Sequence, residues 1–310
     1  MHLLHGFDNP GAYRGGFVAI GNFDGVHRGH QSMVAVLVER ARDKGVPAVV
    51  LTFNPHPLHL LRPEQAPPSL STVEWKAELL EKCGVDCVIA YQTDLELMRL
   101  LPDEFFERVI CNEFDACGVV EGPNFFFGRG RAGDISTLER LCGAANLSLD
   151  IVPPIKVGER FVSSSVIRAR ISEGRIAEAV DLLGHGYVVQ GMVSRGAMRG
   201  RELGFPTANI EHVPTLLPKD GVYAAACRVG ESIYPAAVNL GANPTFGEEH
   251  RKFEVHLIGF TGDLYGRSLG VEFISRVRNT RRFADAGELQ LQMQQDIEQV
   301  RRIVENERLG

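Results

Sequence analysis

The feature that most constrains the fold of this chain is a change of pattern near residue 184. Before it, short apolar runs rich in β-branched residues alternate with segments whose apolar residues recur at helical spacing. After it, helical spacing is absent until about residue 285, and strand-like runs between glycine or proline turns take over. A chain of 310 residues is long enough for two domains of ordinary size. We therefore expect two domains, at 1–183 and 184–310.

The apolar runs of the first half predict a parallel sheet. They are FVAI, AVVLTF, DCVIAY, ACGVVE and LSLDIV, which begin at residues 17, 48, 86, 116 and 147. Runs without polar alternation, each followed by a helical segment, are typical of strands buried on both faces and joined by right-handed crossovers. The fold class is thus α/β, a doubly wound parallel sheet. Ligands of such sheets bind beyond the carboxyl ends of the strands, so the loops there are the expected sites.

The second half predicts a small antiparallel β-barrel. Its strand-like runs, such as YAAACRVG and YPAAVNLG, follow one another with glycine or proline turns between them. Glycine reaches 33 of 310 residues, which suits tight turns and close approach of backbone to a ligand. Apolar residues then recur at helical spacing within residues 285–304, at Leu289, Met293, Ile297 and Val300. This spacing predicts a C-terminal helix packed on the barrel.

Composition narrows the class of protein further. With 44% hydrophobic and 23% charged residues, the chain has the composition of a folded protein rather than a disordered one. A net charge of -6 disfavours non-specific nucleic-acid binding. The 6 cysteines lie in apolar stretches without zinc spacing, and neither a signal peptide nor a membrane-length apolar run is visible. We expect a cytoplasmic protein with no nucleic-acid, membrane or obligate protein partner.

The first segment with chemical content is GNFDGVHRGH, residues 21–30, which joins the strand FVAI to a helix. Its glycines allow a tight turn, and the N-terminus of the following helix favours an anion. His27 and His30 are three residues apart and can point the same way. Such a pair can hold the phosphorus under attack in nucleotidyl transfer, where an enzyme positions groups and stabilises charge. A capped helix with surface histidines, or a fortuitous metal pair, are alternatives that these residues leave open.

The whole decapeptide resembles the H-x-G-H signature of nucleotidyltransferases, in the version found in bacterial bifunctional riboflavin kinase/FAD synthetases. TFNPHP, GPNFFFGRGRAGD and SSSVIR, at residues 52–57, 122–134 and 163–168, resemble further motifs of that family. The resemblance implies that residues 1–183 adenylylate FMN. It further implies three groups of functional residues. The catalytic residues are His27, His30 and Arg168, and the flavin-binding residue is Asn124. The ATP-binding residues are Gly21, Asn22, Phe23, Asp24, Gly25, Ser164 and Ser165.

The segment 122–134 also contains the spacing G-x-G-x-x-G at residues 128–133, which is typical of dinucleotide-binding loops. This match follows the fourth predicted strand rather than the first and carries two arginines, so we interpret it as a coincidence. The chain departs from the family pattern in three places. Asn124 stands where an acidic residue is usual, Phe126 where arginine is frequent, and Ser165 where threonine is usual.

In the second half, GRELGFPTANI at residues 200–210 resembles the riboflavin kinase signature. The chain has no Walker lysine motif, so a kinase here must gather the phosphates with loop backbone and magnesium. Thr207 and Asn209 offer hard oxygen ligands and face the same side if the segment is extended. From the residues alone, an edge turn built on Pro206 is the alternative. The resemblance implies that Gly200, Gly204 and Thr207 bind ATP and that Thr207 and Asn209 bind Mg2+.

A glutamate stands within the apolar strand-like segment FEVHL, and by alternation Glu254 and His256 share a face. The residues alone are compatible with a solvent-facing glutamate. The resemblance implies instead that Glu254 is the base that accepts the proton of the ribityl 5'-hydroxyl of riboflavin. It also implies that Arg278 and Phe283, in VRNTRRF, lie near the flavin.

The resemblance extends from Phe17 to about Arg302, with its motifs in the same order in both halves. It implies that the barrel half phosphorylates riboflavin to FMN and the first half converts FMN to FAD, with ATP and Mg2+ in both steps. Two alternatives stay open. One is a kinase whose adenylyltransferase half is inactive because of the changes at Asn124 and Phe126. The other is a flavin-sensing binding protein, against which the base Glu254 argues, since binding alone needs no base.

Overall fold

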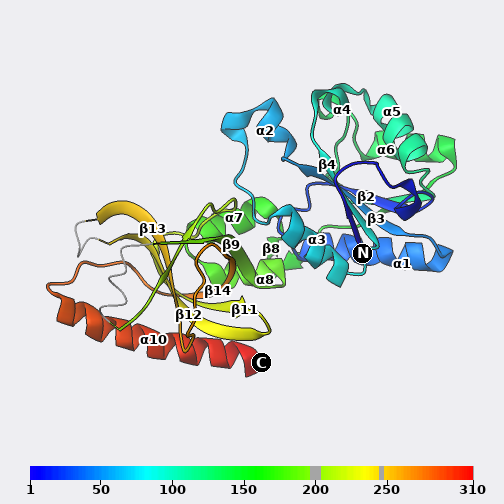
Figure 1. Ribbon diagram of the computed structural model, residues 1–310. Coiled ribbons are helices and arrows are strands. Elements are labelled where there is room, and N and C mark those ends of the chain that lie inside the picture. Colours follow the sequence, from blue (N-terminus) through cyan, green and yellow to red (C-terminus); the bar gives the residue numbers. More distant parts are fainter. Residues whose placement is uncertain (196–203, 244–247, 310) are drawn as a thin grey trace. The chain divides into compact units, whose positions relative to one another are not determined.

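The computed structural model describes residues 1–195, 204–243 and 248–309, which form two compact units (Figure 1). The first unit comprises Met1–Pro68 and Thr72–Ser163, and the second comprises Ser69–Ser71 and Ser164–Gly310. Each unit has its own sheet and its own apolar core.

The first unit is built on a six-stranded sheet in the order β1-β4-β3-β2-β5-β6, in which every neighbouring pair is parallel. Its strands are β1 (His2–Leu4), β2 (Phe17–Ile20), β3 (Ala48–Asn54), β4 (Cys87–Gln92), β5 (Gly118–Glu121) and β6 (Ser148–Ile151). The predicted doubly wound sheet is confirmed. The edge strand β1 was not anticipated, because three residues carry too little periodicity to predict a strand.

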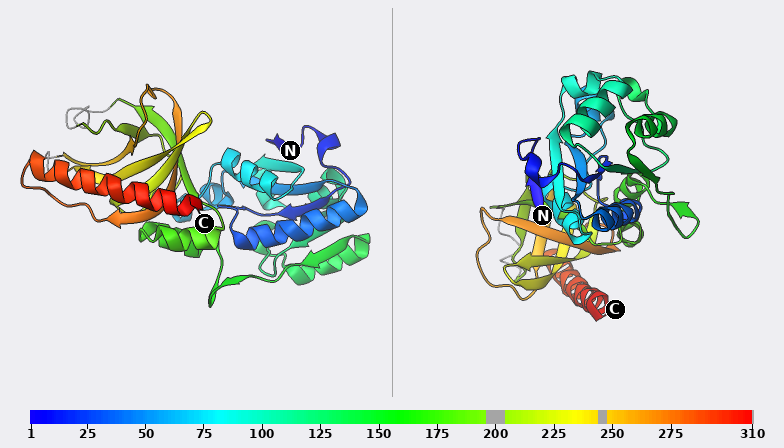
Figure 2. Two further views of the ribbon diagram at one scale, coloured as in Figure 1. Left: turned by 90° about the horizontal axis from the view of Figure 1, so that it is seen from below. Right: turned by 90° about the vertical axis from the view of Figure 1, so that its right-hand side faces the viewer.

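Helices cover both faces of this sheet (Figures 1 and 2). The helical segments are α1 (Arg28–Lys44), α2 (Pro57–Leu61), α3 (Val73–Lys82), α4 (Leu95–Arg99), α5 (Pro102–Phe105), the π-helical Phe106–Glu113 and α6 (Ile135–Ala145), with 3-10 turns at Pro10–Ala12, Pro63–Gln65 and Arg129–Arg131. Val18 and Ile20 of β2 pack with α5, the π-helical segment and α6, whereas Phe17 and Ala19 pack with α1 and α3. Alternate residues of one strand thus fill two separate cores.

The strand order places a switch point between β2 and β5. The chain winds from β2 to β3 on one side, and later adds β5 on the other side of β2. The loops that follow β2 and β5 therefore diverge, and a crevice at the carboxyl ends of these two strands is where doubly wound sheets bind ligands. A small hairpin, β7 (Lys156–Val157) with β8 (Arg160–Phe161), ends this unit.

The second unit contains a closed barrel of six antiparallel strands in the order β10-β13-β12-β11-β14-β9. Its strands are β9 (Tyr187–Ser194), β10 (Ala208–Glu211), β11 (Gly221–Val229), β12 (Ser232–Asn243), β13 (Glu248–Leu257) and β14 (Ser268–Arg278). Val238, Val255 and Phe273 are fully buried, as expected for side chains that point into a small barrel. The predicted barrel is confirmed.

Two helices that precede the barrel belong to the same unit. α7 (Ser164–Ser172) packs on α8 (Ile176–Leu183), and α8 packs on β9 and β14. The structural division therefore falls after Ser163, earlier than the predicted 183/184, because the apolar sides of both helices are buried in the second unit. The prediction that the two functional domains meet between residues 183 and 184 is not tested by this division and stays a prediction.

The C-terminal helix α10 (Ala286–Leu309) lies along the barrel, against β11, β12 and β14 (Figure 2). Val300 and Val304 are buried against Ala224 and Ile258, which confirms the predicted packing. Among the described residues, no helix is both long and apolar enough to cross a membrane.

Candidate functional site

The loop after β2, residues 21–27, is a tight turn at the switch point of the sheet. Phe23 and Val26 have φ of 44° and 38°, and Gly25 has φ of 79°. Non-glycine residues adopt such left-handed conformations only where surrounding contacts hold them there. Gly21, Asn22, Phe23, Asp24 and Gly25, the predicted ATP-binding residues, all lie in this turn.

His27 ends the turn and caps α1. Its Nδ1 accepts a hydrogen bond from the backbone N–H of His30 at 3.3 Å. The two rings are stacked, with centroids 3.6 Å apart and planes 13° from parallel. Gly29 leaves room for the His27 ring, since a Cβ at that position would lie 3.1 Å from it and crowd it. The structure thus brings together the two histidines that the spacing predicted to share a side.

Burial controls the charge of His30. Burial lowers the pKa of His30 well below its usual value, and the neighbouring His27 and Lys76 lower it further. His30 is therefore neutral at pH 7 and carries one N–H for donation. His27 is also buried, at 6% exposure.

Two buried polar atoms, one in the loop and one in the first turn of α1, point to a ligand. The Oδ1 of Asn22 and the Nδ1 of His30 have no hydrogen-bond partner within the described part of the chain. A buried polar atom without a partner costs about 1–3 kcal/mol, so folded proteins rarely tolerate it without reason. A polar ligand at the start of α1 supplies such a reason.

Two buried charged residues beside this loop were missed by the sequence analysis. Lys76 of α3 is 5% exposed, and its Nζ donates to the carbonyl of Asn22 at 2.6 Å. Glu121, at the end of β5, is 2% exposed and accepts a hydrogen bond from the N–H of Ile20 at 2.7 Å. Burial raises the pKa of Glu121 well above its usual value. Lys76 shares the buried side of its helix with Leu79 and Leu80, a position at which a single charged residue does not by itself indicate a function.

The loop after β5 contains Asn124 and the glycine spacing that resembles a dinucleotide motif. Asn124 is exposed, and Phe127 and Gly133 close the loop by two reciprocal backbone hydrogen bonds of 3.0 Å. Two of the three glycines serve packing. A Cβ on Gly128 would lie 2.8 Å from the backbone nitrogen of Pro102, and one on Gly133 would lie 2.9 Å from the Phe127 ring. Gly130 has no such contact, but its φ of 66° is a conformation that favours glycine.

The loop's central aromatic is exposed. Phe126 is 44% exposed and lies under the guanidinium of Arg131, with 4.6 Å from Cζ to the ring centroid. Its neighbours Phe125 and Phe127 stack on each other at 5.4 Å. Contact of this loop with a flavin at Asn124 stays a prediction.

Ser164, Ser165 and Arg168 lie in the first two turns of α7, as predicted for a helix start, and they belong to the second unit. Whether they share a site with His27 and His30 stays a prediction.

In the barrel, strand register aligns the predicted kinase residues. Glu254 of β13 is directly opposite Asn209 of β10 on one side and Asn239 of β12 on the other, and Asn209 is opposite Ser194 of β9. Side chains directly opposite each other project from the same face of a sheet. Glu254 lies between the buried Phe253 and Val255, so this polar row is on the outer face of the barrel. Glu254 is half-buried there, whereas a glutamate that only faced solvent would be exposed.

The segment before β10 is attached to this row. The Nδ1 of His256 donates to the carbonyl of Pro206 at 2.8 Å, and the Phe205 ring meets the His256 ring edge to face. Burial lowers the pKa of His256, which favours its neutral form. Thr207 follows immediately, and Gly204 begins the segment with a φ of 86°. Gly200 lies outside the described residues.

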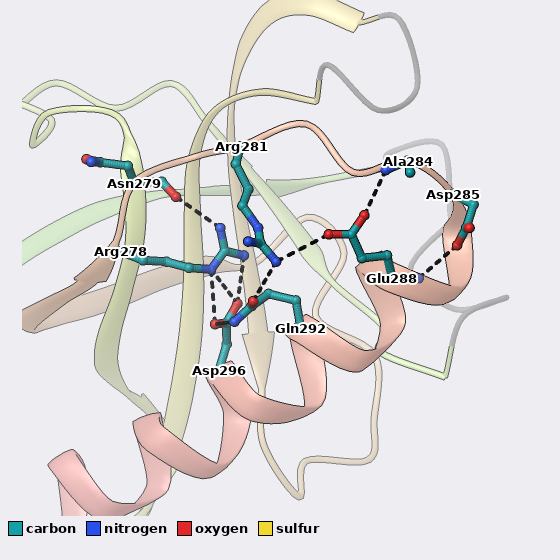
Figure 3. A network of polar contacts seen from close by, with 8 residues as sticks. All are labelled: Arg278, Asn279, Arg281, Ala284, Asp285, Glu288, Gln292 and Asp296. Atoms are coloured by element: carbon teal, nitrogen blue, oxygen red, sulfur yellow. Dashed lines mark hydrogen bonds and ion pairs between the residues drawn. The ribbon is translucent and has the colours of Figure 1, made fainter.

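Arg278, at the end of β14, is joined to the C-terminal helix (Figure 3). Its Nε and Nη2 donate to the carboxylate of Asp296 at 3.0 and 2.7 Å, and Asp296 is 5% exposed. Gln292 also donates to Asp296, at 2.9 Å, and accepts from Arg281 at 2.9 Å. The predicted flavin-binding Arg278 thus forms an ion pair with the buried carboxylate of Asp296.

Phe283 lies near both arginines. The Cζ atoms of Arg278 and Arg281 are 5.6 and 4.7 Å from its ring centroid, and the ring is 6% exposed. The loop returns to α10 through Ala284, whose N–H donates to Glu288 at 2.9 Å (Figure 3). Arg278 and Phe283 are therefore adjacent, but their contact with a flavin stays a prediction.

A ligand loop at the switch point of a parallel sheet, and a separate barrel with its own polar row, are features of a two-domain transferase of phosphorylated compounds. The family model for FAD synthetase matches residues 10–166, and that for riboflavin kinase matches residues 183–304. The bifunctional riboflavin kinase/FMN adenylyltransferase of Escherichia coli K12 is 33% identical over 96% of both chains. That of Bacillus subtilis is 33% identical over 93% of this chain and 92% of its own. The chain belongs to the bifunctional riboflavin kinase/FMN adenylyltransferase family.

A solved structure from Streptococcus pneumoniae has the same fold along almost its whole length. It superposes with a TM-score of 0.84 at 29% identity, over 96% of this chain and 98% of that chain. That chain is described as a macrolide-efflux protein. This comparison shows that the two chains share their fold.

Proposed function

We propose that the two activities of this family are divided between the two halves of the chain, so that residues 184–310 phosphorylate riboflavin to FMN and residues 1–183 adenylylate FMN to FAD. The observation that carries the first assignment is the stacked pair of the buried His27 and the half-buried His30 at the switch point of the sheet. The separate matches of the FAD synthetase and riboflavin kinase models to the two halves support the division.

In the adenylylation step, a phosphate oxygen of FMN attacks the α-phosphorus of ATP. One P–O bond forms while the bond from the α-phosphorus to the bridging oxygen breaks, and pyrophosphate leaves with the electron pair. No covalent enzyme intermediate is needed, so the protein contributes position and charge stabilisation. We assign this to His27 and His30, at the N-terminus of α1, with the turn at residues 21–25 around the nucleotide.

We further assign Ser164, Ser165 and Arg168 to the ATP phosphates. Hydroxyls and a guanidinium at a helix start are suitable donors for phosphate oxygens. Asn124 is assigned to the flavin side of the same reaction, supported by its place in the exposed loop after β5.

In the kinase step, the ribityl 5'-hydroxyl of riboflavin attacks the γ-phosphorus of ATP. Glu254 accepts the hydroxyl proton as the new P–O bond forms, and ADP leaves when the bond to the bridging oxygen breaks. The half-buried position of Glu254 between two asparagines supports this role, since the amides keep the carboxylate in a polar setting. Gly200, Gly204 and Thr207 are assigned to ATP, and Arg278 and Phe283 to the loop beside the flavin.

Magnesium fits the residues of the barrel row. Asn209 and Glu254, directly opposite each other, and the adjacent Thr207 offer oxygen atoms, which Mg2+ prefers. In the parts of the chain that the structure describes, no group of three or more His, Cys, Asp or Glu could hold a metal ion. Mg2+ commonly binds through one or two protein oxygens together with substrate phosphates, so Thr207 and Asn209 suffice. When bound with ATP, the metal neutralises phosphate charge during transfer.

We place the enzyme in the cytoplasm, with ATP, riboflavin and FMN as its partners. All six cysteines are free thiols. Burial raises the pKa of Cys87 and Cys142 to about 11, which keeps these thiols protonated and unreactive. Unpaired core thiols are usual in a reducing compartment.

The test is separation of flavins after incubation of the protein with riboflavin, ATP and Mg2+. We expect His27→Ala to lower FAD formation by about 100-fold or more, as for loss of one transition-state donor, while FMN formation continues. Glu254→Ala is expected to abolish FMN formation while added FMN is still converted to FAD. The exposed residues His5 and Glu305 provide matched controls, His5→Ala and Glu305→Ala. Loss of both activities in either folded variant would refute the division, and absence of FAD from wild type supplied with FMN would leave only the kinase.

A further inference from the structure

The ammonium group of Lys76 lies beneath the nucleotide loop and takes no part in the steps described above. At 5% exposure, it is the most deeply buried lysine among the described residues. A buried ammonium is costly unless hydrogen bonds replace its water. Burial lowers the pKa of Lys76 to about 8, and the nearby carboxylate of Asp24 opposes this change. A charge retained in such a place needs a reason beyond helix stability.

The hydrogen bonds of Lys76 converge on one backbone atom. Its Nζ donates to the carbonyl of Asn22 at 2.6 Å and to the Oγ1 of Thr52 at 3.0 Å. The Oγ1 of Thr52 donates to the same Asn22 carbonyl at 2.9 Å. Thr52 is fully buried near the end of β3. A helix and a neighbouring strand thus hold the peptide that begins the turn.

That peptide precedes the strained part of the loop. Phe23 directly follows Asn22, and both Phe23 and Val26 are held at positive φ. Such conformations cost about 1–3 kcal/mol each and persist only when contacts impose them. Lys76 and Thr52 hold the backbone carbonyl of Asn22, while its side-chain Oδ1 has no hydrogen-bond partner in the described residues. The backbone of the loop is therefore held in one conformation, and the Asn22 Oδ1 can still accept a hydrogen bond from a ligand. A preformed ligand-binding loop requires both.

We propose that Lys76 is a positioning residue for adenylyl transfer, which acts through the Asn22 carbonyl to hold in its reactive shape the loop that carries His27 and leads into the helix with His30. The inference rests on the proposed function of the first unit. Lys76 is assigned no contact with ATP, because its ammonium is buried against protein groups. Its contribution is to the rate of the reaction rather than to affinity for FMN.

Lys76→Met tests the inference, because methionine fills similar space without a charge or donor. We expect kcat for conversion of FMN to FAD to fall about 10- to 100-fold, as for displacement of a reacting group by ~1 Å. KM for FMN should stay within about threefold, since no flavin contact is removed. FMN formation by the same protein should be unchanged, and urea unfolding at the assay pH gives the folded fraction. Lys82→Met, an exposed lysine of the same helix, is the matched control.

Thr52→Val provides a second variant in case Lys76→Met does not fold. It removes one hydroxyl from the same carbonyl, and we expect kcat for FAD formation to fall about fivefold without a change in KM, equivalent to one neutral hydrogen bond. Because both groups act on the same atom, the double variant should be within about threefold of Lys76→Met alone.

Three results would overturn the inference. They are a kcat for FAD formation within threefold of wild type in folded Lys76→Met, an unchanged kcat in Thr52→Val, and an equal loss of FAD and FMN formation. Failure of the wild-type enzyme to make FAD from FMN would overturn the proposed function of the first unit as well. The two failures are thus distinguished by the wild-type reaction.

Discussion

At the scale of single residues, the buried charges of this protein carry more information than its motifs. His27 and His30 were predictable because two histidines beside glycines form a recognisable local pattern. Lys76 and Glu121 were not, because a lone charge in an apolar segment has many explanations. Their burial is decided by which helix and strand cover them, and the structure places both beside the ligand loop.

The pKa of Lys76 gives a stability prediction with a definite sign. Its pKa is about 8 in the folded protein against 10.5 in the reference state. Between these values the folded state binds fewer protons than the unfolded chain, so stability rises with pH. The contribution of this group is present above the unfolded pKa and is lost as pH falls through the folded pKa.

We therefore expect the free energy of unfolding of wild type to gain about 2 kcal/mol relative to Lys76→Met between pH 7.5 and 9.5, at ~1.4 kcal/mol per pKa unit. Urea unfolding of both proteins at the two pH values measures this difference, because other titrating groups are common to both. A difference that is constant over this range would show that Lys76 titrates normally.

At the scale of elements, context decides what a motif means. Residues 128–133 match a dinucleotide fingerprint, yet the loop follows β5, and Gly128 and Gly133 are explained by contacts with Pro102 and Phe127. The same reasoning applies to Arg278. The family resemblance implies a flavin contact, whereas the structure gives this side chain a carboxylate partner on α10.

We expect Arg278→Ala to lower the free energy of unfolding by about 3–5 kcal/mol, because it leaves the buried Asp296 carboxylate without its guanidinium, and Asp296→Ala to cost less, because Arg278 keeps partial access to water. The double variant should lose less than the sum of the two. Glu298→Ala, which removes an exposed ion pair with Arg302 on the same helix, should change stability by less than about 1 kcal/mol.

KM for riboflavin separates the two roles of Arg278. If its main role is to attach β14 to α10, both single variants raise KM equally. If Arg278 contacts the flavin, Arg278→Ala raises KM more than Asp296→Ala does. Steady-state FMN formation with the two variants provides the comparison.

At the scale of the whole molecule, the change from helical to strand-like periodicity and the boundary between the two structural units lie at different residues. Strand-like spacing begins after residue 184, but the second unit begins at Ser164. Helices α7 and α8 look like the first half because they are helices, and they belong to the second unit because their apolar residues are buried there. Periodicity reports the type of an element, whereas membership of a unit depends on packing.

This division predicts the behaviour of fragments. A fragment of residues 164–310 should be more stable than one of residues 184–310 by at least about 3 kcal/mol, because it retains the burial of Ile167, Ile171 and Leu183. Urea unfolding of the two fragments tests this. Equal midpoints would instead favour the predicted limit at 183/184 as the structural boundary as well.

By itself, the sequence determined the two fold classes, the order of their elements and the residues of the local motifs. These follow from periods of 2 and about 3.6 residues and from neighbours within a loop, which are short-range properties. Tertiary structure decided that Lys76 holds Asn22, 54 residues away, that Glu254 lies opposite Asn209, and that Arg278 pairs with Asp296. Each of these depends on strand register or on the packing of one element against another. Such contacts form between segments distant in the chain, so no local pattern specifies them.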